Sequence, residues 1–402
     1  MRNSLQAASP SVSYLEWQQR LLEEAQEGMD HLSVVLERNG ADYDDLTYKR
    51  SGERVWPGGP APALDDLQRE PADIPVVSFF TGCGGMDLGF EAAGFKHLCA
   101  FEFNELFCNT LRRNRPQWRV FGPPTHLGDL SQVDEIVQAL AGVVSSPFEG
   151  IFIGGPPCQP LPIASNQRFS KSGANFKRVG FDHERNGGLL FDYIELILEF
   201  KPAVFVIENV PGLRDIDGGS QLSSAVRTLF GAGYDINQPV VLDAADFGVP
   251  QRRNRLFVIG TRLARWIQLP PARQGHIGCG AVLPDRVPAA PNNETRKHRA
   301  SSVARYMALD YGARDQLGRV DRLDPSLPAK TVIAGGSGGG GRSHLHPEIP
   351  RTLSVRECAR LQSFPDDYVF VGPTARQFTQ VGNAVPPVLA AQLASEIRDA
   401  ME

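Results

Sequence analysis

One cysteine of this chain has the setting of a nucleophile. Cys158 lies in the segment GGPPCQP at residues 154–160, directly after the apolar run Ile151–Ile153. The two prolines before it cannot continue the hydrogen-bonding ladder of a strand, and the two glycines let another group come close to the backbone. The pattern predicts a buried strand that ends in a rigid turn carrying a thiol. Because ligands of open α/β sheets bind at such strand ends, we interpret Cys158 as a candidate nucleophile.

A carboxylate occupies a second position of this kind. Glu208 directly follows the apolar run Val204–Ile207. Neighbouring parallel strands lie about 5 Å apart, so Glu208 and Cys158 are expected to converge on one small substrate. Desolvation at an apolar sheet edge raises the pKa of a carboxyl group, which suits a proton donor. A helix-capping or salt-bridging carboxylate is the alternative interpretation.

Three arginines precede a further apolar run. The segment 251–255 reads QRRNR and leads into Leu256–Ile259. Alternation along an extended segment predicts that Arg253 and Arg255 point to one side and Arg252 to the other. Arg253 and Arg255 could then bind a base carbonyl and a neighbouring carboxylate. A solvated run of charge is the alternative.

A glycine-rich turn indicates a cofactor site. The apolar run Val76–Phe80 leads into TGCGG at residues 81–85, and a helical pattern follows. Such a turn lets a ligand approach the backbone, although the pattern here is GxGG and not GxGxxG. Glu102 ends the second strand pattern, where an acidic residue commonly bonds a ribose diol, and Asp129 is placed to reach an adenine amine. Together these residues predict a site for an adenosine-containing cofactor; alone, the glycine turn could serve packing.

The elements that must position these residues alternate regularly from Pro75 to about residue 262. Apolar runs predict strands, and helical spacing predicts helices, at these ranges: strands 76–80, 97–101, 151–153, 204–207 and 256–259; helices 86–93, 106–113, 133–143, 189–200 and 222–230. Alternating units with near-continuous apolar strands predict an α/β fold with a doubly wound, mostly parallel sheet.

The remaining regions have other patterns. Helical spacing over residues 14–39 and a stretch rich in Gly, Pro and charge over 50–74 predict a helical extension with a linker at residues 1–74. We expect this extension to pack on the main domain; an appendage that binds a protein partner is the alternative. Residues 263–349, rich in Pro, Gly, Arg and His, predict a separate small domain, after which helical patterns return at 354–363 and 387–401.

Composition and charge restrict the class of protein. Of 402 residues, 42% are hydrophobic and 22% are charged, as is usual for globular proteins. The formal net charge of −5 gives no overall basic character, so local segments must carry any nucleic-acid binding. The six cysteines form no CxxC pair, which favours neither zinc nor a disulfide framework. With no signal region or membrane-spanning apolar run, we expect a cytoplasmic protein in a reducing compartment, without a metal.

In this order, the motifs resemble those of the C5-cytosine-specific DNA methyltransferase family. The resemblance runs from residue 75 to the C-terminus and includes the Phe80–Gly85 turn, PPCQ (156–159), ENV (208–210) and QRRNR (251–255). It continues with RTLSVRECARLQSFP (351–365) and QVGNAVPP (380–387). It implies a Rossmann-like methyltransferase fold with a catalytic domain at 75–262, an irregular target-recognition domain at 263–349 and a return to the catalytic domain at 350–402.

The resemblance implies a mechanism with base flipping. The Cys158 thiolate attacks C6 of a flipped cytosine in duplex DNA, Glu208 holds N3, Arg255 binds O2 and Arg253 orders the site. C5 then takes a methyl group from S-adenosyl-L-methionine, which leaves S-adenosyl-L-homocysteine, and loss of the C5 proton expels the thiol. A covalent adduct divides a difficult step, and C6 is shielded in a stacked duplex.

The same resemblance assigns the binding residues. Contacts to the cofactor are implied for Phe80, Gly82, Gly84, Gly85, Glu102, Phe103, Asp129, Leu130, Pro157, Leu189, Asn383 and Val385. Contacts to DNA are implied for Gln159, Asn209, Gln251, Arg296, Lys297, Arg299, Lys330 and Thr331. Double-stranded DNA is therefore the expected partner of a monomeric, nucleoid-associated enzyme. A role in restriction-modification or another defence system follows by analogy.

The chain departs from the family pattern after Cys158-Gln159. Pro160 and Pro162 replace residues that commonly contact DNA phosphate, and they should stiffen the loop. Pro160 also raises the alternative of a tRNA cytosine-5 methyltransferase, although QRRNR follows the DNA-enzyme pattern. A non-catalytic relative that only binds cofactor or DNA is the other alternative, and such relatives usually lose the cysteine or the glutamate that this chain retains.

Overall fold

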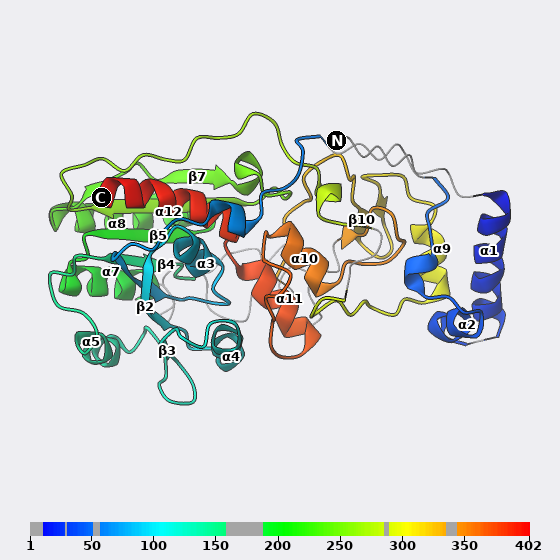
Figure 1. Cartoon of the computed structure of the whole chain (residues 1–402), viewed down its shortest axis with the longest axis horizontal. Helices are drawn as coiled ribbons and strands as arrows, with labels where there is room; N and C mark the ends of the chain where they lie inside the picture. Colours follow the sequence, from blue (N-terminus) through cyan, green and yellow to red (C-terminus); the bar gives the residue numbers. More distant parts are fainter. Residues whose placement is uncertain (1–10, 29, 51–56, 158–187, 285–288, 335–343) are drawn as a thin grey trace.

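The computed structural model describes residues 11–28, 30–50, 57–157, 188–284, 289–334 and 344–402 (Figure 1). A large lobe, here called the sheet lobe, holds the central sheet and the helices that cover it. A smaller second lobe is formed by residues 11–50 together with residues 289–323 and 344–354. Helices α10 (Val355–Leu361) and α11 (Thr374–Asn383) lie between the two lobes (Figure 1).

The central sheet confirms the predicted fold class. Its strand order is β3-β2-β1-β4-β5-β8-β6, and β7 also pairs with β8. The parallel strands are β1 (Pro75–Phe79), β2 (Lys96–Phe101), β3 (Val120–Phe121), β4 (Ile151–Gly154) and β5 (Val204–Asn209). The antiparallel strands are β6 (Asp235–Ile236), β7 (Val240–Asp243) and β8 (Asn254–Thr261). The order reverses between β1 and β4, which is where a doubly wound sheet opens a crevice for ligands.

Helices cover both faces of this sheet. On one face, α5 (Val133–Ala141), α7 (Gly188–Phe200) and α8 (Ser220–Gly231) pack on Phe79, Phe101, Phe152 and Phe205. On the other face, α3 (Gly85–Ala92) and α12 (Pro387–Met401) pack on Val76, Ile151, Ile153 and Val204. Successive strand residues thus serve opposite cores, which is why these strands are apolar without interruption. Helix α4 (Glu105–Asn114) follows β2.

The predicted elements of this lobe and of the C-terminal segment are confirmed, with ends shifted by no more than about two residues. The sequence did not predict β3, β6, β7 or α11. Strands β3 and β6 have two residues each, too few for an alternating pattern to be visible.

The second lobe contains α1 (Val12–Glu27), α2 (Leu32–Arg38), α9 (Ala300–Tyr306) and a small sheet. This sheet comprises β9 (Arg314–Asp315), β10 (Val320–Arg322) and β11 (His344–Leu345). Leu21, Leu22 and Val35 of the extension share one buried cluster with Val303 and Met307. The expectation that the extension packs on the main domain was therefore wrong for α1 and α2, which pack on α9 (Figure 1).

The predicted linker is also fastened to the sheet lobe. A 3-10 turn at Leu64–Leu67 packs on α3 and α12. Arg69 pairs with Asp399 at 2.7 Å, and its backbone N–H donates to the carbonyl of Ala92. Residues 64–69 are therefore held on the face of the sheet lobe that α3 and α12 cover.

Candidate active site

The turn after β1 is shaped by residues in the left-handed region. Phe80, Gly82 and Gly84 have φ values of 52°, 59° and 83°. A Cβ atom at Gly82 would meet only the Phe80 carbonyl oxygen, at 4.0 Å, whereas one at Gly84 would lie 2.9 Å from Leu111 Cδ2. One at Gly85 would lie 2.3 Å from the Val385 carbonyl oxygen. Gly82 is thus the open position, while Gly84 and Gly85 are small because other segments pack on them.

Glu102 at the end of β2 is joined to this turn. Its side chain is buried, with Oε2 accepting from the Gly82 N–H at 2.7 Å and Oε1 from the Asn104 N–H at 2.8 Å. Burial raises the pKa of Glu102 to about 7, although the backbone N–H groups oppose this shift. A buried carboxylate beside an open glycine fits the proposed contact to a ribose diol.

Other predicted cofactor residues surround this pair. Phe103 is 48% exposed beside Glu102, and Asp129 is half-buried after Gly128, whose Cα packs on the Glu102 carbonyl. Asp192 of α7, which the sequence analysis missed, has its pKa raised by burial, then by Glu195 and Asp129. This places a second carboxylate beside Asp129, and half-buried Leu189 begins the same helix.

Two predicted cofactor residues are brought in by the C-terminal segment. Cys83 donates to the Gln380 carbonyl at 3.4 Å, which holds the segment 380–385 against the turn after β1. Asn383 in this segment is exposed, whereas Val385 is buried among residues of α3 and α12. Leu130 is likewise buried in the core of the sheet lobe. The side chains of Val385 and Leu130 thus serve packing, which does not fit a direct side-chain contact to a cofactor.

Strands β4 and β5, which precede Cys158 and carry Glu208, are parallel neighbours as predicted. Gly154 pairs with Ile207, so Gly155 lies beside Glu208. A Cβ atom at position 155 would lie 2.8 Å from Glu208 Oε2, and Asn209 Nδ2 donates to the Pro156 carbonyl at 2.9 Å. Half-buried Pro157 ends this described stretch, and Cys158 and Gln159 lie outside the described residues. Glu208 therefore lies directly against the backbone that leads into the predicted nucleophile.

Arg255 on β8 holds the Glu208 carboxylate. Arg255 Nε lies 2.7 Å from Glu208 Oε1, and both side chains are nearly buried. Desolvation raises the pKa of Glu208, and the charges of Arg255 and Arg253 oppose this shift. Glu208 is therefore a salt-bridging carboxylate, which was the alternative interpretation. The salt bridge lies at the end of β5, where the catalytic interpretation also places Glu208. We call Gly155, Glu208, Arg253 and Arg255 the strand-end site.

Arg253 connects three parts of the chain. It is 1% exposed, with Nη1 donating to the Val332 carbonyl at 3.2 Å and Nη2 to the Gly382 carbonyl at 2.6 Å. Burial, and next the charge of Arg255, lower its pKa well below the usual value. Arg252 points elsewhere, to Asp243 at 3.2 Å, as alternation predicts.

The prediction that Gln251 contacts DNA was wrong, because its side chain is used inside the protein. It is fully buried: Nε2 donates to the Leu361 carbonyl and to Gln362 Oε1, and Oε1 accepts from the Val332 N–H. Asn209 is also buried, and its amide serves Pro156. Both amides are used to join segments of the protein, because a buried amide costs free energy unless it is hydrogen-bonded.

Comparisons with known proteins agree with this geometry. The model of the C-5 cytosine-specific DNA methylase family matches residues 74–277 and 287–399. The chain belongs to this family. It is 31% identical to the type II methyltransferase M.PspPI of Psychrobacter sp. (strain TA137), over 83% of this chain and 81% of that protein. It is 32% identical to the type II methyltransferase M.Eco47II of Escherichia coli, over 77% of this chain and 75% of that protein.

Solved structures share the fold. The structure of the Entamoeba histolytica methyltransferase EhMeth superposes with a TM-score of 0.58 and 15% identity, over 82% of this chain and 99% of that one. The predicted identity of a C5-cytosine DNA methyltransferase is confirmed by the family match, and this family implies the use of S-adenosyl-L-methionine. The match begins at residue 74, so α1 and α2 lie outside it.

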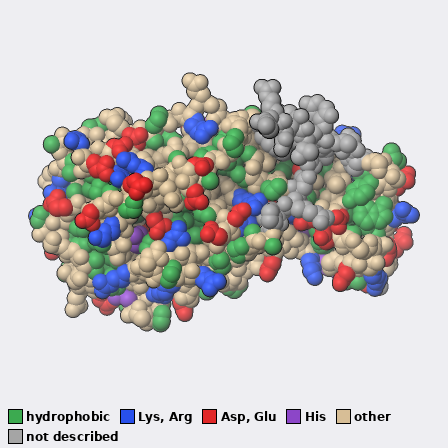
Figure 2. Space-filling view, viewed as in Figure 1, with side chains coloured by type: hydrophobic (Ala, Val, Ile, Leu, Met, Phe, Trp, Pro, Cys, Tyr) green, Lys and Arg blue, Asp and Glu red, His purple; other side chains and the backbone are tan. Residues whose placement is uncertain are grey.

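The predicted DNA contacts of this methyltransferase differ in their surroundings. Arg296, Lys297 and Arg299 are exposed, and no acidic partner is seen for them among the described residues. Lys330 instead pairs with Asp321 at 3.0 Å, and Thr331 Oγ1 donates to the Arg252 carbonyl at 2.7 Å. On the face seen in Figure 2, acidic and basic side chains are interspersed, as the net charge of −5 suggests.

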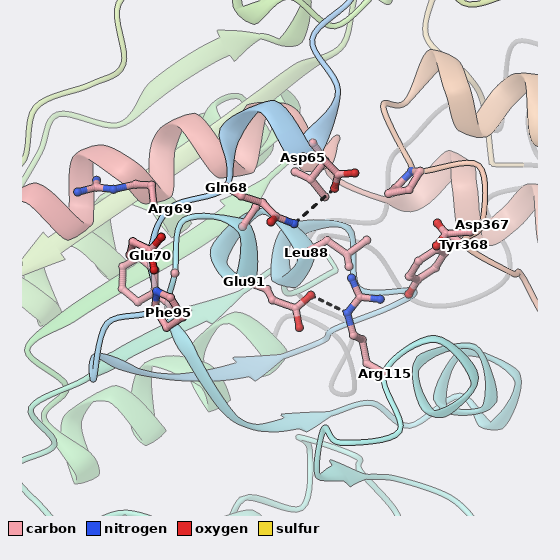
Figure 3. A pocket seen from close by; sticks show the side chains of 15 residues that line it. Asp65, Gln68, Arg69, Glu70, Leu88, Glu91, Phe95, Arg115, Asp367 and Tyr368 are labelled. Atoms are coloured by element: carbon pink, nitrogen blue, oxygen red, sulfur yellow. Dashed lines mark hydrogen bonds and ion pairs between the residues drawn. The ribbon is translucent and has the colours of Figure 1, made fainter.

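A cavity of about 570 Å³ lies behind the turn after β1 (Figure 3). It is lined by α3, the segment 64–71, Arg115 and residues 365–368, and none of the predicted site residues lines it. Arg115 is paired with Glu91 at 2.6 Å, and Tyr368 donates to the Cys83 carbonyl at 2.6 Å. Tyr368 thus joins the lining of the cavity to the turn after β1.

Within the described ranges, no group of three His, Cys, Asp or Glu side chains is arranged to hold a metal ion. In the same ranges, no helix is both long and apolar enough to span a bilayer.

Proposed function

We propose that this enzyme methylates C5 of cytosine in duplex DNA through a covalent adduct with Cys158. The observation that supports this mechanism is the contact of Glu208 with Gly155 at the start of the Cys158 turn, together with its 2.7 Å pair to Arg255. A carboxyl group and a guanidinium at one strand end can engage the N3 and O2 positions of a single flipped base. The thiol then needs to reach C6 of that same ring.

The protein groups have distinct tasks. Burial favours the protonated form of Glu208, which can donate to N3 and draw electron density from C6 as the thiolate attacks. Arg255 supplies a fixed positive charge beside the base, where it stabilises developing negative charge. Arg253 donates to the carbonyls of Val332 and Gly382, so its task is to order the segments around the site.

The residues around Gly82 fit S-adenosyl-L-methionine. Glu102 would accept from the ribose diol, Phe103 would cover the adenine, and Asp129 would accept from its amine, while Phe80, Asn383 and the main chain near Val385 line the other side. When bound, this cofactor supplies an electrophilic methyl group. The protein's own contribution is to hold the base, exclude water and keep the reacting ring in place.

We further propose that the enzyme serves a restriction-modification system, because the two relatives above are type II methyltransferases. Such an enzyme would act alone on double-stranded DNA. The target-recognition role proposed for residues 263–349 rests on the resemblance described above.

The direct test is to incubate purified protein and S-adenosyl-L-methionine with a duplex containing 5-fluorocytosine. Methyl transfer to this base leaves no C5 proton to remove, so a stable protein–DNA adduct is expected. Cys158→Ser should form no adduct and should still bind S-adenosyl-L-homocysteine. Bisulfite sequencing of DNA from expressing cells identifies the modified sequence.

A parallel assay on total tRNA tests the alternative that Pro160 raised. Transfer to tRNA and not to the duplex would contradict the proposal. So would cofactor binding without any transfer, which is expected of a non-catalytic relative.

A further inference from the structure

The amino-terminal extension, which lies outside the family match, forms part of the core of the second lobe. Leu21, Leu22 and Val35 are buried together with Val303 and Met307. Helices α1, α2 and α9 accordingly lie together at the end of the molecule farthest from the central sheet (Figure 1). Removing the extension would expose this apolar cluster, so the segment around α9 depends on residues 11–50 for its packing.

One hydroxyl joins the extension to the segment before α9. Tyr43 is buried; its hydroxyl donates to the His298 carbonyl at 2.6 Å and accepts from the His298 N–H at 3.0 Å. Both main-chain polar groups of His298 are thereby used by a single side chain. The turn that carries Tyr43 is itself fixed, because Asp42 and Asp45 form a reciprocal capping box around it.

The side chain of His298 is held as firmly as its main chain. Nε2 accepts from the Thr352 N–H at 3.2 Å and lies 3.1 Å from Thr352 Oγ1. Tyr43 and Tyr306 pack edge-on against the ring, at 6.3 and 5.6 Å between centroids. The buried histidine therefore fixes the conformation of the chain at position 298.

The neighbours of His298 are cationic and point outward. Arg296, Lys297 and Arg299 are exposed on either side of the buried ring. In a chain of net charge −5, such a cluster is the kind of surface that can bind phosphate. The outer face of α1 is unsuited to this, because Glu16, Glu23, Glu24 and Glu27 are exposed on it.

We propose that Tyr43 is a positioning residue for DNA binding, which presents Arg296, Lys297 and Arg299 to the phosphate backbone by fixing His298. The extension is then a part of the target-recognition apparatus that acts through its inner face. This inference rests on the proposed function, since it assumes that duplex DNA is the substrate.

The test compares Tyr43→Phe with Tyr234→Phe in the full chain. Tyr234 is a matched control because it is also buried and its hydroxyl also donates to a main-chain carbonyl, that of Pro202 at 2.9 Å, but within the sheet lobe. Binding of a fluorescein-labelled duplex is measured over a range of salt concentrations, and binding of S-adenosyl-L-homocysteine is measured in parallel. Tyr43→Phe should weaken duplex binding about three- to tenfold and reduce its salt dependence, because fewer phosphate contacts form. Binding of S-adenosyl-L-homocysteine should not change, and Tyr234→Phe should change neither.

A double-mutant cycle separates positioning from general destabilisation. When Arg296, Lys297 and Arg299 are all replaced by Ala, Tyr43→Phe should cause no further loss of duplex binding. Thr352→Val removes the Oγ1 contact to the His298 ring while the main-chain N–H of residue 352 remains. It should behave in the same way and gives a second variant if Tyr43→Phe does not fold. Equal losses in both backgrounds, or unchanged duplex binding by a folded Tyr43→Phe protein, would overturn the inference. If the wild-type protein methylates the duplex in these cases, the proposed function stands and only the role of Tyr43 falls.

Discussion

The strand-end site and the second lobe are assembled in different ways. At the strand-end site, Gly155, Glu208 and Arg255 come from strands that are neighbours in one sheet, so register alone brings them together. In the second lobe, Tyr43, His298 and Thr352 come from three remote segments joined by side-chain hydrogen bonds. The first arrangement follows from the regular geometry of a sheet, while the second exists only once distant parts of the chain have met.

Arg253 connects the strand-end site to the helices between the two lobes. It stands one residue before β8 begins, and it binds the carbonyls of Val332 and Gly382. Gln251 joins Val332 to Leu361 in the same region. The strand that carries Arg255 is therefore tied through Arg253 and Gln251 to Val332 and to helices α10 and α11. Changes in the two regions should have separable effects, except where they touch this connection.

The largest effect is expected at Glu208. Glu208→Gln removes the proton donor and leaves Arg255 without its anionic partner, so methyl transfer should slow about a thousandfold. Single-turnover transfer from labelled S-adenosyl-L-methionine measures this loss. Glu195→Gln is the control, since Glu195 is exposed on α7. A Glu208→Gln enzyme within tenfold of wild type would show that the strand-end site is structural.

Arg253 tests the connection between the regions. Arg253→Met leaves the carbonyls of Val332 and Gly382 without donors in a buried place, which should lower the free energy of unfolding by about 3 kcal/mol. Urea denaturation compares it with Arg252→Met, whose side chain is 57% exposed and whose effect should be below about 1 kcal/mol. Equal losses in the two variants would mean that the hydrogen bonds of Arg253 to Val332 and Gly382 do not stabilise the protein.

Gly155 separates activity from stability. In Gly155→Ala, the new Cβ would lie 2.8 Å from Glu208 Oε2, so the flexible carboxylate must move while the backbone can stay in place. We expect methyl transfer about tenfold slower with little change in melting temperature. Gly231→Ala is the control, because nothing lies within 4 Å of a Cβ there. Parallel losses of activity and stability would instead indicate general disruption.

The smallest effect is expected from pH. The pKa of Glu102 is raised to about 7, so this group holds a proton below that value and is anionic above it. Since the anion accepts better from a ribose diol, affinity for S-adenosyl-L-homocysteine should rise severalfold from about pH 6 to about pH 8 and then level off. Calorimetric titration measures this rise, and it should disappear in Glu102→Gln. A pH-independent affinity in the wild type would contradict the assignment of Glu102.

Much of the fold was predictable because its signals are local. Strand and helix patterns, and the glycine and proline turns at their ends, each depend on residues close in sequence. They sufficed to predict that the strand carrying Glu208 lies beside the strand that leads to Cys158, and that Glu102 and Gly82 belong to one site. The dense packing at Gly85 and the internal role of Gln251 were missed, because the partners Val385 and Leu361 are more than a hundred residues away.

The amino-acid sequence by itself determined the doubly wound sheet, the strand ends that carry the chemistry and the family of this enzyme. Tertiary structure alone decided that polar residues such as Gln251 and Asn209 join segments of the protein, and where the extension packs. The physical reason is that periodicity and turn propensity act within a few residues, whereas the hydroxyl of Tyr43 meets His298 only when both have been buried against α9.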